Sequence, residues 1–484
     1  MQSKQSSLPR VVIILLLAWF LLLIKLGDPF INWRDASQVW IPASVRNFSE
    51  YDRVDLGWMV TKTSYPVESV EQLNPYSHHP PLVVWLPYVV TQFAGFNEVA
   101  IRFIFKATML IAIAVFYTLA RRLFDKTVAF WATLLFALTP MNSFFHAGLA
   151  HEPIATMSLL LYATIFINWL RQPTGARYIG LICTAILSVF SAWSAVIFVG
   201  VIGIYGMLVG NWKHRIGVIG LGFVSITSIM VMLLLYELWA PNSIERLINV
   251  FFYRSSASIS GSETETITVI GWLLNFFHHM FFYATAALFL MGFGGFALMK
   301  RYSNRMTRGF TIALLIAGLL YLLVFRNAGY NHIYYKAFTL PALCITSAFV
   351  IIYSRQGKRR FLRPLVDSLL VVFVIQIGIV FTTGFSTPHE NSVLKLIDYL
   401  QDSSIQTDNL YVTFPDSIYG TNVSLEYYSR KQIDWNIPLE DITIEDDAVY
   451  IFCHESQQYM NENVTEPSEV EIIDEICYVY RFSS

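Results

Sequence analysis

The sequence predicts an all-α polytopic membrane protein with a small α/β domain at its C-terminal end. Three observations lead to this fold class: 55% of the 484 residues are hydrophobic, only 14% are charged, and the mean hydropathy is +0.50. A soluble globular chain is less apolar and carries more charge. The composition therefore excludes a soluble Rossmann enzyme, a disordered chain and a disulfide scaffold. No nucleic-acid partner is predicted.

Long apolar runs predict about eleven membrane spans, because a helix needs about 20 apolar residues to cross a bilayer. The first run follows Lys4 and Arg10, and we interpret it as an uncleaved span because no small-residue cleavage site precedes Gly27. The predicted spans are 11–26, 99–120, 127–147, 153–170, 178–191, 193–211, 216–236, 277–299, 309–325, 337–354 and 365–385.

The apolar segment 81–95 decides the orientation of every later loop. It is shorter than the ~20 residues of a span and contains Pro87, so we predict that it lies at the outer interface without crossing. Five basic clusters then fall on the cytoplasmic side, as the positive-inside rule requires. They are 121–126, 171–177, 213–215, 300–308 and 355–363. These features predict a multi-pass protein of the plasma (inner) membrane with a cytoplasmic N-terminus.

Two domains are predicted: a transmembrane domain, 1–385, whose first outer loop is 27–97, and an extracytoplasmic α/β domain, 386–484. After Pro388 the chain has 19 acidic and 4 basic residues, and its short apolar runs are β-branched or aromatic, which favours strands. The predicted strands are 410–414, 448–453 and 476–482, and the predicted helices are 392–401 and 423–428. Cys453 and Cys477 lie on predicted strands, where a disulfide and two plain core cysteines are both compatible with the sequence.

Ionisable residues gather at the predicted outer ends of the spans, whereas the spans themselves are almost bare of them. Charges within the hydrocarbon are costly, so a transporter would be expected to place such residues at mid-span along a pathway. The outer-end set is Arg34, Asp35, His78, His79, Glu98, Arg102, His151, Glu152, Arg326, His332 and Lys336. Their common predicted depth indicates one site open to the outer leaflet, where a lipid headgroup would be presented.

Each member of this set also has a plain structural interpretation. Asp35 alone could be a solvated loop acid, and Glu98 and Arg102 are four residues apart, the spacing of an ion pair on one helical turn. Glu152, followed by a proline, fits the first turn of a helix, and Lys336 could extend to the interface. The functional hypothesis therefore depends on the set and not on any one residue.

Several short motifs occur in an order that is typical of a known family. They are Trp33-Arg34-Asp35, His79-Pro80-Pro81-Leu82, Glu98-x-x-x-Arg102, Arg121-Arg122-Leu123-Phe124, His151-Glu152-Pro153 and His332-x-Tyr334-Tyr335. Over residues 10–385 this pattern resembles the GT-C glycosyltransferases, within them the bacterial branch related to protein O-mannosyltransferases and the lipid A aminoarabinose transferase.

The resemblance implies an inverting transferase that takes a sugar from a polyprenyl-phosphate carrier, with Asp35 as the base. Two positions depart from the pattern: Ala36 stands where many relatives have a glutamate, and Glu152 stands where many have an aspartate. Ala36 cannot perform any role that the glutamate has in those relatives. Glu152 keeps a carboxylate, on a side chain longer than that of aspartate.

The residues support the same chemistry. An outer site has little access to nucleotide sugars and no Gly-rich phosphate loop adjoins a strand, so an activated sugar would arrive on a membrane lipid. A carboxylate must take the proton of the acceptor hydroxyl, and cations must meet the charge on the departing phosphate. The predicted roles are catalytic for Asp35 and Glu152, donor phosphate-binding for Lys336, His332, His79 and Arg102, and substrate-binding for His78, His151 and Tyr335.

The predicted partners are a polyprenyl-phosphate sugar donor, membrane lipids, and an acceptor that is an envelope glycan, a lipid or a protein. No cofactor is predicted, although Asp35, Glu152 and nearby histidines offer ligands that suit a divalent metal. The alternative functions are a lipid-linked glycan transporter or flippase and a non-catalytic membrane scaffold. A flippase would need a polar path through the bilayer, and a scaffold would need no convergent outer cluster.

Overall fold

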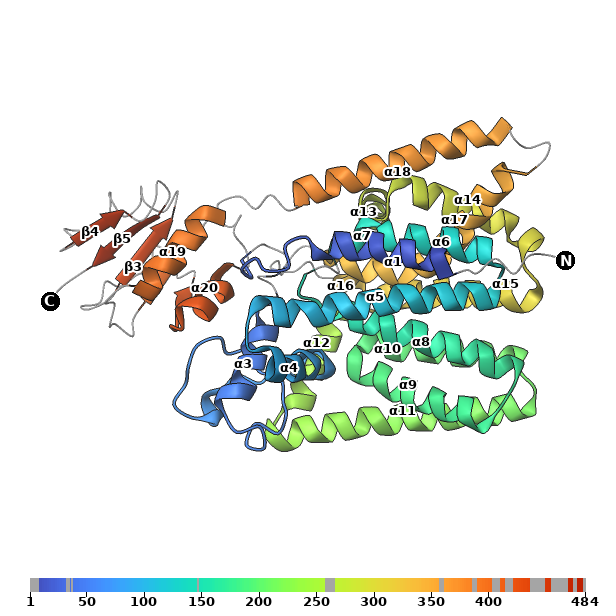
Figure 1. Cartoon of the computed structure of the whole chain (residues 1–484). Helices are drawn as coiled ribbons and strands as arrows, with labels where there is room; N and C mark the ends of the chain where they lie inside the picture. Colours follow the sequence, from blue (N-terminus) through green and yellow to red (C-terminus); the bar gives the residue numbers. More distant parts are fainter. Residues whose placement is uncertain are drawn as a thin grey trace. The chain divides into compact units, whose positions relative to one another are not determined.

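The computed structural model describes residues 8–31, 35, 38–145, 148–256, 266–356, 361–384, 390–402, 410–413, 421–435, 449–453, 469–472 and 477–481. The chain divides into two compact units (Figure 1). Unit 1 consists of Met1–Leu26, Ser77–Gly95 and Val99–Gly384, and unit 2 consists of Gly27–Tyr76, Phe96–Glu98 and Phe385–Ser484. Most of the first predicted outer loop, Gly27–Tyr76, thus groups with the C-terminal segment in unit 2, whereas Ser77–Gly95 belongs to unit 1.

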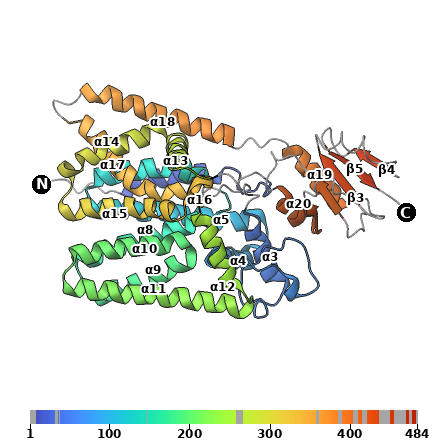
Figure 2. The ribbon, with the colours of Figure 1, turned by 180° about the vertical axis from the view of Figure 1, so that it is seen from behind.

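Unit 1 is built of helices, most of which run side by side (Figures 1 and 2). In the first half of the chain they are α1 (Leu8–Leu23), α4 (Leu82–Ala94), α5 (Glu98–Leu123), α6 (Lys126–Leu138), α7 (Pro140–Ser143), α8 (Glu152–Arg171), α9 (Gly175–Ser191), α10 (Trp193–Val209) and α11 (Trp212–Trp239). In the second half they are α12 (Ser243–Ser255), α13 (Val269–Tyr283), α14 (Ala286–Tyr302), α15 (Arg305–Val324), α16 (Arg326–Asn331), the 3-10 helix η3 (Ile333–Thr339), α17 (Leu340–Ser354) and α18 (Arg363–Gly384).

Six helical segments among the described residues are long and apolar enough to cross a membrane, or seven if one bent pair of helices counts as a span. They are Glu98–Leu123, Glu152–Arg171, Trp212–Trp239, Arg305–Val324, Ile333–Ser354 and Arg363–Thr383. Each coincides with a predicted span. The predicted spans 11–26, 127–147, 178–191 and 193–211 form shorter apolar helices, so the number eleven stays a prediction.

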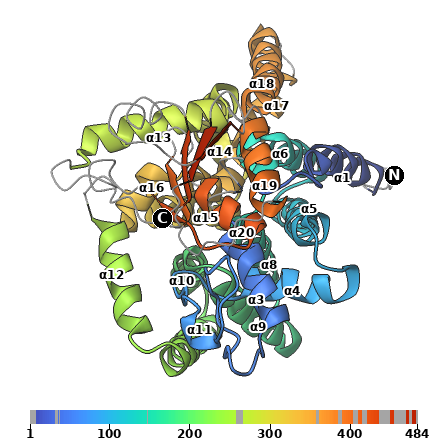
Figure 3. The same ribbon diagram turned by 90° about the vertical axis from the view of Figure 1, so that its left-hand side faces the viewer.

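The predicted span 277–299 is wrong as a single helix. Two helices, α13 and α14, meet there at an angle of 109°, and Thr285 between them has a φ of 76°. The Thr285 hydroxyl accepts a hydrogen bond from the Leu288 N–H and so starts α14 anew. As a result α13 runs across the long helices of unit 1, while α14 runs along them (Figures 1 and 3).

A glutamine from another helix satisfies the backbone groups at this break. Gln376 in α18 accepts a hydrogen bond from the Ala286 N–H at 2.9 Å and donates one to the Phe281 carbonyl at 3.1 Å. Free backbone groups are costly in an apolar environment, so a side-chain amide that pairs with both stabilises the break.

The segment 81–95, which the sequence analysis does not count as a span, forms α4 of 13 residues. In Figure 3 this helix runs across the long helices of unit 1 and does not follow them. Pro81 caps its start and Gly95 ends it with a φ of 78°.

The C-terminal part of unit 2 contains a five-stranded sheet in the order β2-β1-β3-β5-β4. The strands are β1 (Leu410–Thr413), β2 (Asp434–Trp435), β3 (Val449–Cys453), β4 (Glu469–Ile472) and β5 (Cys477–Arg481), with helices α19 (Glu390–Asp402) and α20 (Thr421–Ser429). β1 pairs in parallel with β2 and β3, while β5 pairs antiparallel with β3 and β4. Cys477 is disulfide-bonded, and the register of β3 and β5 places Cys453 directly opposite.

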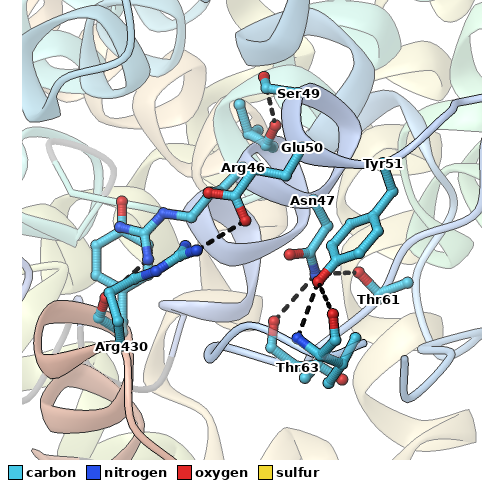
Figure 4. Close-up of polar contacts among 11 residues, drawn as sticks. Arg46, Asn47, Ser49, Glu50, Tyr51, Thr61, Thr63 and Arg430 are labelled. Carbon is cyan, nitrogen blue, oxygen red and sulfur yellow. Dashed lines mark hydrogen bonds and ion pairs between the residues drawn. The ribbon is translucent and has the colours of Figure 1, made fainter. Parts of the chain in front are cut away.

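The first predicted loop packs on α20 within unit 2. It contains α3 (Trp40–Glu50) and the 3-10 helix η1 (Val70–Gln72). Arg46 of α3 lies over the Tyr427 ring, 3.9 Å from its centre, and donates to the Tyr427 carbonyl, while Arg430 pairs with Glu50 at 2.9 Å (Figure 4). The amide of Asn47 donates to Thr61 and Thr63, which ties α3 to the following strand-like segment (Figure 4).

Candidate functional site

A buried cluster of polar side chains lies where α4 and α8 begin in unit 1. His79 precedes α4 by two prolines, and the His79 and His151 rings are 4.5 Å apart between centres. His151 caps α8, and its Nε2 lies 3.1 Å from a carboxylate oxygen of Glu152. All three side chains are buried. The acid stands in the first turn of α8, where the helix dipole favours a negative charge.

The segment between α15 and α17 supplies the opposite side of this cluster. Tyr335 on η3 is buried, and its ring lies 6.1 Å from that of His151 and 5.2 Å from that of His332. The Lys336 ammonium is fully buried and donates to the Gly329 carbonyl at 2.7 Å. Residues 79, 151 and 335, far apart in sequence, are therefore neighbours in the structure, as their common predicted depth requires.

Burial and nearby positive charges keep two histidines of the cluster, His79 and His332, neutral. Burial lowers the pKa of His79 well below its usual value, and the positive charges of His151 and Arg254 lower it further. Burial, then Arg254 and Lys336, lowers the pKa of His332 to about 4. At neutral pH these two imidazoles can hydrogen-bond to a phosphate but do not carry the positive charge that would neutralise it.

Arg254 is a cation of this site that the sequence analysis did not select. It lies in the last turn of α12, which packs against α16, and its charge acts on both His79 and His332. The sequence contained a signal: Arg254 is a basic residue between the predicted spans 216–236 and 277–299, on the side of the membrane that the charge pattern places outside.

Arg102 is turned toward the end of α1. Its guanidinium donates to the Leu26 carbonyl at 3.3 Å, and Lys106, one turn further along α5, donates to the carbonyls of Leu22 and Ile24. Both side chains are buried. The last carbonyls of a helix lack partners within it and attract positive charge. The phosphate-binding role assigned to Arg102 stays a prediction.

Asp35 belongs to unit 2, where it is fully buried and its carbonyl accepts a hydrogen bond from the Gln38 N–H. Trp33 and Arg34, the other members of its motif, lie outside the described residues. The base assigned to Asp35 therefore stays a prediction. His78 is half-buried and precedes His79 in unit 1.

Within the described part of the chain, no three His, Cys, Asp or Glu side chains are grouped so that they could hold a metal ion. Among the ion pairs of the described residues, Glu152 takes part in one, with His151 at 3.1 Å. Two basic side chains, Arg254 and Lys336, lie near the cluster.

The chain thus combines a multi-helix fold with a buried polar cluster where α4 and α8 begin. Residues 78–239 match the sequence model of the family described as dolichyl-phosphate-mannose-protein mannosyltransferase. This range includes the His79-Pro80-Pro81 turn, the Glu98–Arg102 motif and the start of α8. By sequence the chain matches no curated protein.

Solved structures with this fold are similar over nearly the whole chain. ArnT from Cupriavidus metallidurans, bound to undecaprenyl phosphate, is 12% identical and superposes with a TM-score of 0.65 over 97% of each chain. The oligosaccharyltransferase AglB from Archaeoglobus fulgidus, in complex with an inhibitory peptide and a dolichol-phosphate, is 13% identical with a TM-score of 0.53 over 87% of this chain and 64% of its own. The resemblance to GT-C glycosyltransferases is confirmed at the level of the fold.

Proposed function

We propose that this protein is a membrane glycosyltransferase that moves a sugar from a polyprenyl-phosphate carrier to an extracytoplasmic acceptor. The match of residues 78–239 to a family named for a dolichyl-phosphate-linked sugar carries the proposal. The likeness in fold to ArnT, which was solved with undecaprenyl phosphate, supports the same class of donor. The acceptor is an envelope glycan, a lipid or a protein.

The proposed reaction is a single inverting displacement. The acceptor hydroxyl oxygen forms a bond to the anomeric carbon while the bond from that carbon to the phosphate oxygen breaks on the opposite face. The acceptor proton passes to the Asp35 carboxylate, and polyprenyl phosphate leaves with the bonding electrons. A positioned general base contributes about 10²- to 10⁴-fold to such a step.

Cations at the helix ends would meet the charge on the leaving phosphate. Arg254 supplies positive charge near His79 and His332, and Lys336 lies near His332. Preorganised charges of this kind stabilise a departing anion. The neutral imidazoles of His79 and His332 would add hydrogen bonds. The Glu152 carboxylate, 3.1 Å from His151, would orient the acceptor or its base.

The proposed arrangement in the membrane follows the charge pattern of the sequence. The basic loops lie in the cytoplasm, and the cluster and unit 2 lie outside the plasma (inner) membrane. This places the site where a lipid-linked sugar is presented and nucleotide sugars are scarce.

The decisive experiment compares Asp35→Asn with Asp125→Asn in the full-length protein reconstituted in nanodiscs. Asp125 caps α6 by accepting hydrogen bonds from the Thr127 and Val128 N–H groups, a role that asparagine also fills. The substrates are undecaprenyl-phosphate-linked mannose, glucose and aminoarabinose with cell-envelope extract as acceptor, and released undecaprenyl phosphate is measured.

We expect Asp35→Asn to lower turnover by about 10²-fold or more and Asp125→Asn to leave it unchanged. Equal turnover in Asp35→Asn and the wild type would contradict the catalytic assignment. Transfer of labelled donor between the leaflets of a vesicle without any released phosphate would instead identify a flippase.

A further inference from the structure

Two of the four residues in the turn formed by His78, His79, Pro80 and Pro81 cannot donate a backbone hydrogen bond. The two prolines have no N–H, and each restricts the residue before it to an extended conformation. The first hydrogen bonds of α4 run from Val84 and Trp85 to the Pro81 carbonyl at 2.9 and 3.0 Å. The carbonyls of the two histidines therefore need donors from other parts of the chain.

Two aromatic side chains supply these donors. The Trp193 indole N–H donates to the His78 carbonyl at 3.0 Å, and the Tyr236 hydroxyl donates to the His79 carbonyl at 2.8 Å. Tyr236 is buried, and its hydrogen bond is buried as well. Two successive carbonyls of the turn are thus held by residues that follow them by 115 and 157 positions.

The positions of the two donors follow from the helices that carry them. Ala192 is extended, with φ −168°, and separates α9 from α10, so that Trp193 is the first residue of α10. Tyr236 lies in the last turn of α11. A helix start and a helix end from neighbouring elements therefore reach the same turn.

The other side of the turn faces the candidate site. The His79 ring packs against His151 of α8, and His78, Arg254 of α12 and His332 before η3 are its further charged or titratable neighbours. The two hydrogen bonds hold the backbone that carries the imidazole beside these groups.

We propose that Trp193 and Tyr236 are positioning residues that hold the His78–Pro81 turn and so set the place of the His79 imidazole in the donor phosphate site. This inference rests on the proposed function. It adds two side chains, from α10 and α11, that act on the reaction only through His79.

The test uses Tyr236→Phe and Trp193→Phe, which remove one hydrogen-bond donor each, with Tyr205→Phe as the matched control. Tyr205 is also buried and its hydroxyl also donates to a backbone carbonyl, that of Met306 at 2.7 Å, but it serves the packing of α10 on α15. All three proteins are examined as full-length chains whose thermal unfolding midpoints are measured first.

The first measurement is independent of catalysis. Diethyl pyrocarbonate acylates accessible neutral imidazoles, and peptide mass spectrometry reports the rate at His79. We expect slow acylation in the wild type and in Tyr205→Phe, and a rate about tenfold higher in Tyr236→Phe and Trp193→Phe, because local opening exposes the turn.

The second measurement is the pH profile of turnover with the undecaprenyl-phosphate-linked sugars named above. A displacement of about 1 Å in a catalytic site can lower the rate by up to about 10²-fold. We therefore expect turnover to fall about 10- to 100-fold in the two variants. Release of His79 from its buried place should also bring its pKa back toward the ordinary 6.5 and add a pH dependence there that Tyr205→Phe lacks.

The outcomes separate the two proposals. If Tyr236→Phe and Trp193→Phe match Tyr205→Phe in both acylation and pH profile, the two contacts serve folding alone and the inference is overturned. If acylation of His79 rises as expected but even the wild type releases no phosphate from any donor, the turn is held as inferred and the proposed function fails.

Discussion

The protonation states of His79 and His332 decide what these two residues can contribute to the candidate site. Both imidazoles have a pKa below the ordinary 6.5, His332 at about 4, because burial and nearby cations disfavour the protonated form. They therefore act as neutral hydrogen-bonding groups, and the proposed function takes its positive charge from Arg254.

This depression predicts how stability depends on pH. The unfolded chain takes up protons on these histidines as pH falls below 6.5, whereas the folded chain does not, so the folded state loses stability over that range. Above pH 6.5 the histidines are unprotonated in both states, so no stability is lost there. For His332 the loss of stability ends near pH 4, where the folded chain also takes up the proton. The expected slope is about 1 kcal/mol per residue and pH unit.

The check is the thermal unfolding midpoint in detergent at pH 7.5 and pH 5.0. We expect a lower midpoint at pH 5.0 and a smaller difference in His332→Gln, which cannot titrate. A difference of the same size in wild type and His332→Gln would show that the protonation of other groups causes the acid sensitivity.

At the scale of elements, close approach of helices shapes unit 1. α14 packs against α17 where Gly295 faces the backbone of Thr346, and a side chain on Gly295 would overlap that carbonyl group. Small residues allow such contacts between membrane helices. The neighbouring Gly294 has only Val350 at 3.8 Å from the position of an added Cβ.

The two adjacent glycines therefore predict opposite effects of the same substitution. Gly295→Ala should destabilise the protein by about 1–3 kcal/mol through overpacking against backbone. Gly294→Ala should be neutral or stabilising by up to about 1 kcal/mol, because alanine favours the helix. Denaturation of the purified variants in mixed micelles measures both, and an equal stability of the two would refute the packing argument.

At the scale of the whole molecule, the proposed function requires side chains of the protein to neutralise the charge on the leaving polyprenyl phosphate. We expect that treatment with EDTA, followed by its removal, leaves release of undecaprenyl phosphate unchanged, because the Arg254 guanidinium already provides positive charge. The control is readdition of Mg²⁺ or Mn²⁺. Activity that disappears with EDTA and returns with either ion would assign part of this role to a bound metal.

Several features of the fold could be predicted from the sequence because they depend on composition along a single segment. Six apolar runs form helices of spanning length, and α4 runs across them, because hydrophobic length and the prolines determine such elements locally. Three strands near 410, 449 and 477 also form where β-branched and aromatic residues gather. The strand β4 was not predicted, nor was β2, which at two residues is too short for such a signal.

The candidate site was only partly predictable. The sequence placed His79, His151 and Tyr335 at one depth, and the structure brings their rings together. It could not distinguish Arg102, which donates to the Leu26 carbonyl beyond the end of α1, from Arg254, whose charge acts on the cluster. Both are basic residues near predicted outer ends, and only the direction of each side chain separates their roles.

By itself the sequence determined that the chain is an apolar, multi-helix protein with a polar cluster at one end of its helices, because hydrophobicity and charge pattern are properties of each segment. Tertiary structure alone decided the break at Thr285, since nothing local requires it and Gln376 of a distant helix satisfies its backbone groups. Tertiary structure also decided that Trp193 and Tyr236 donate hydrogen bonds to the His78–Pro81 turn. Hydrogen bonds between residues more than a hundred positions apart form only once the helices have packed.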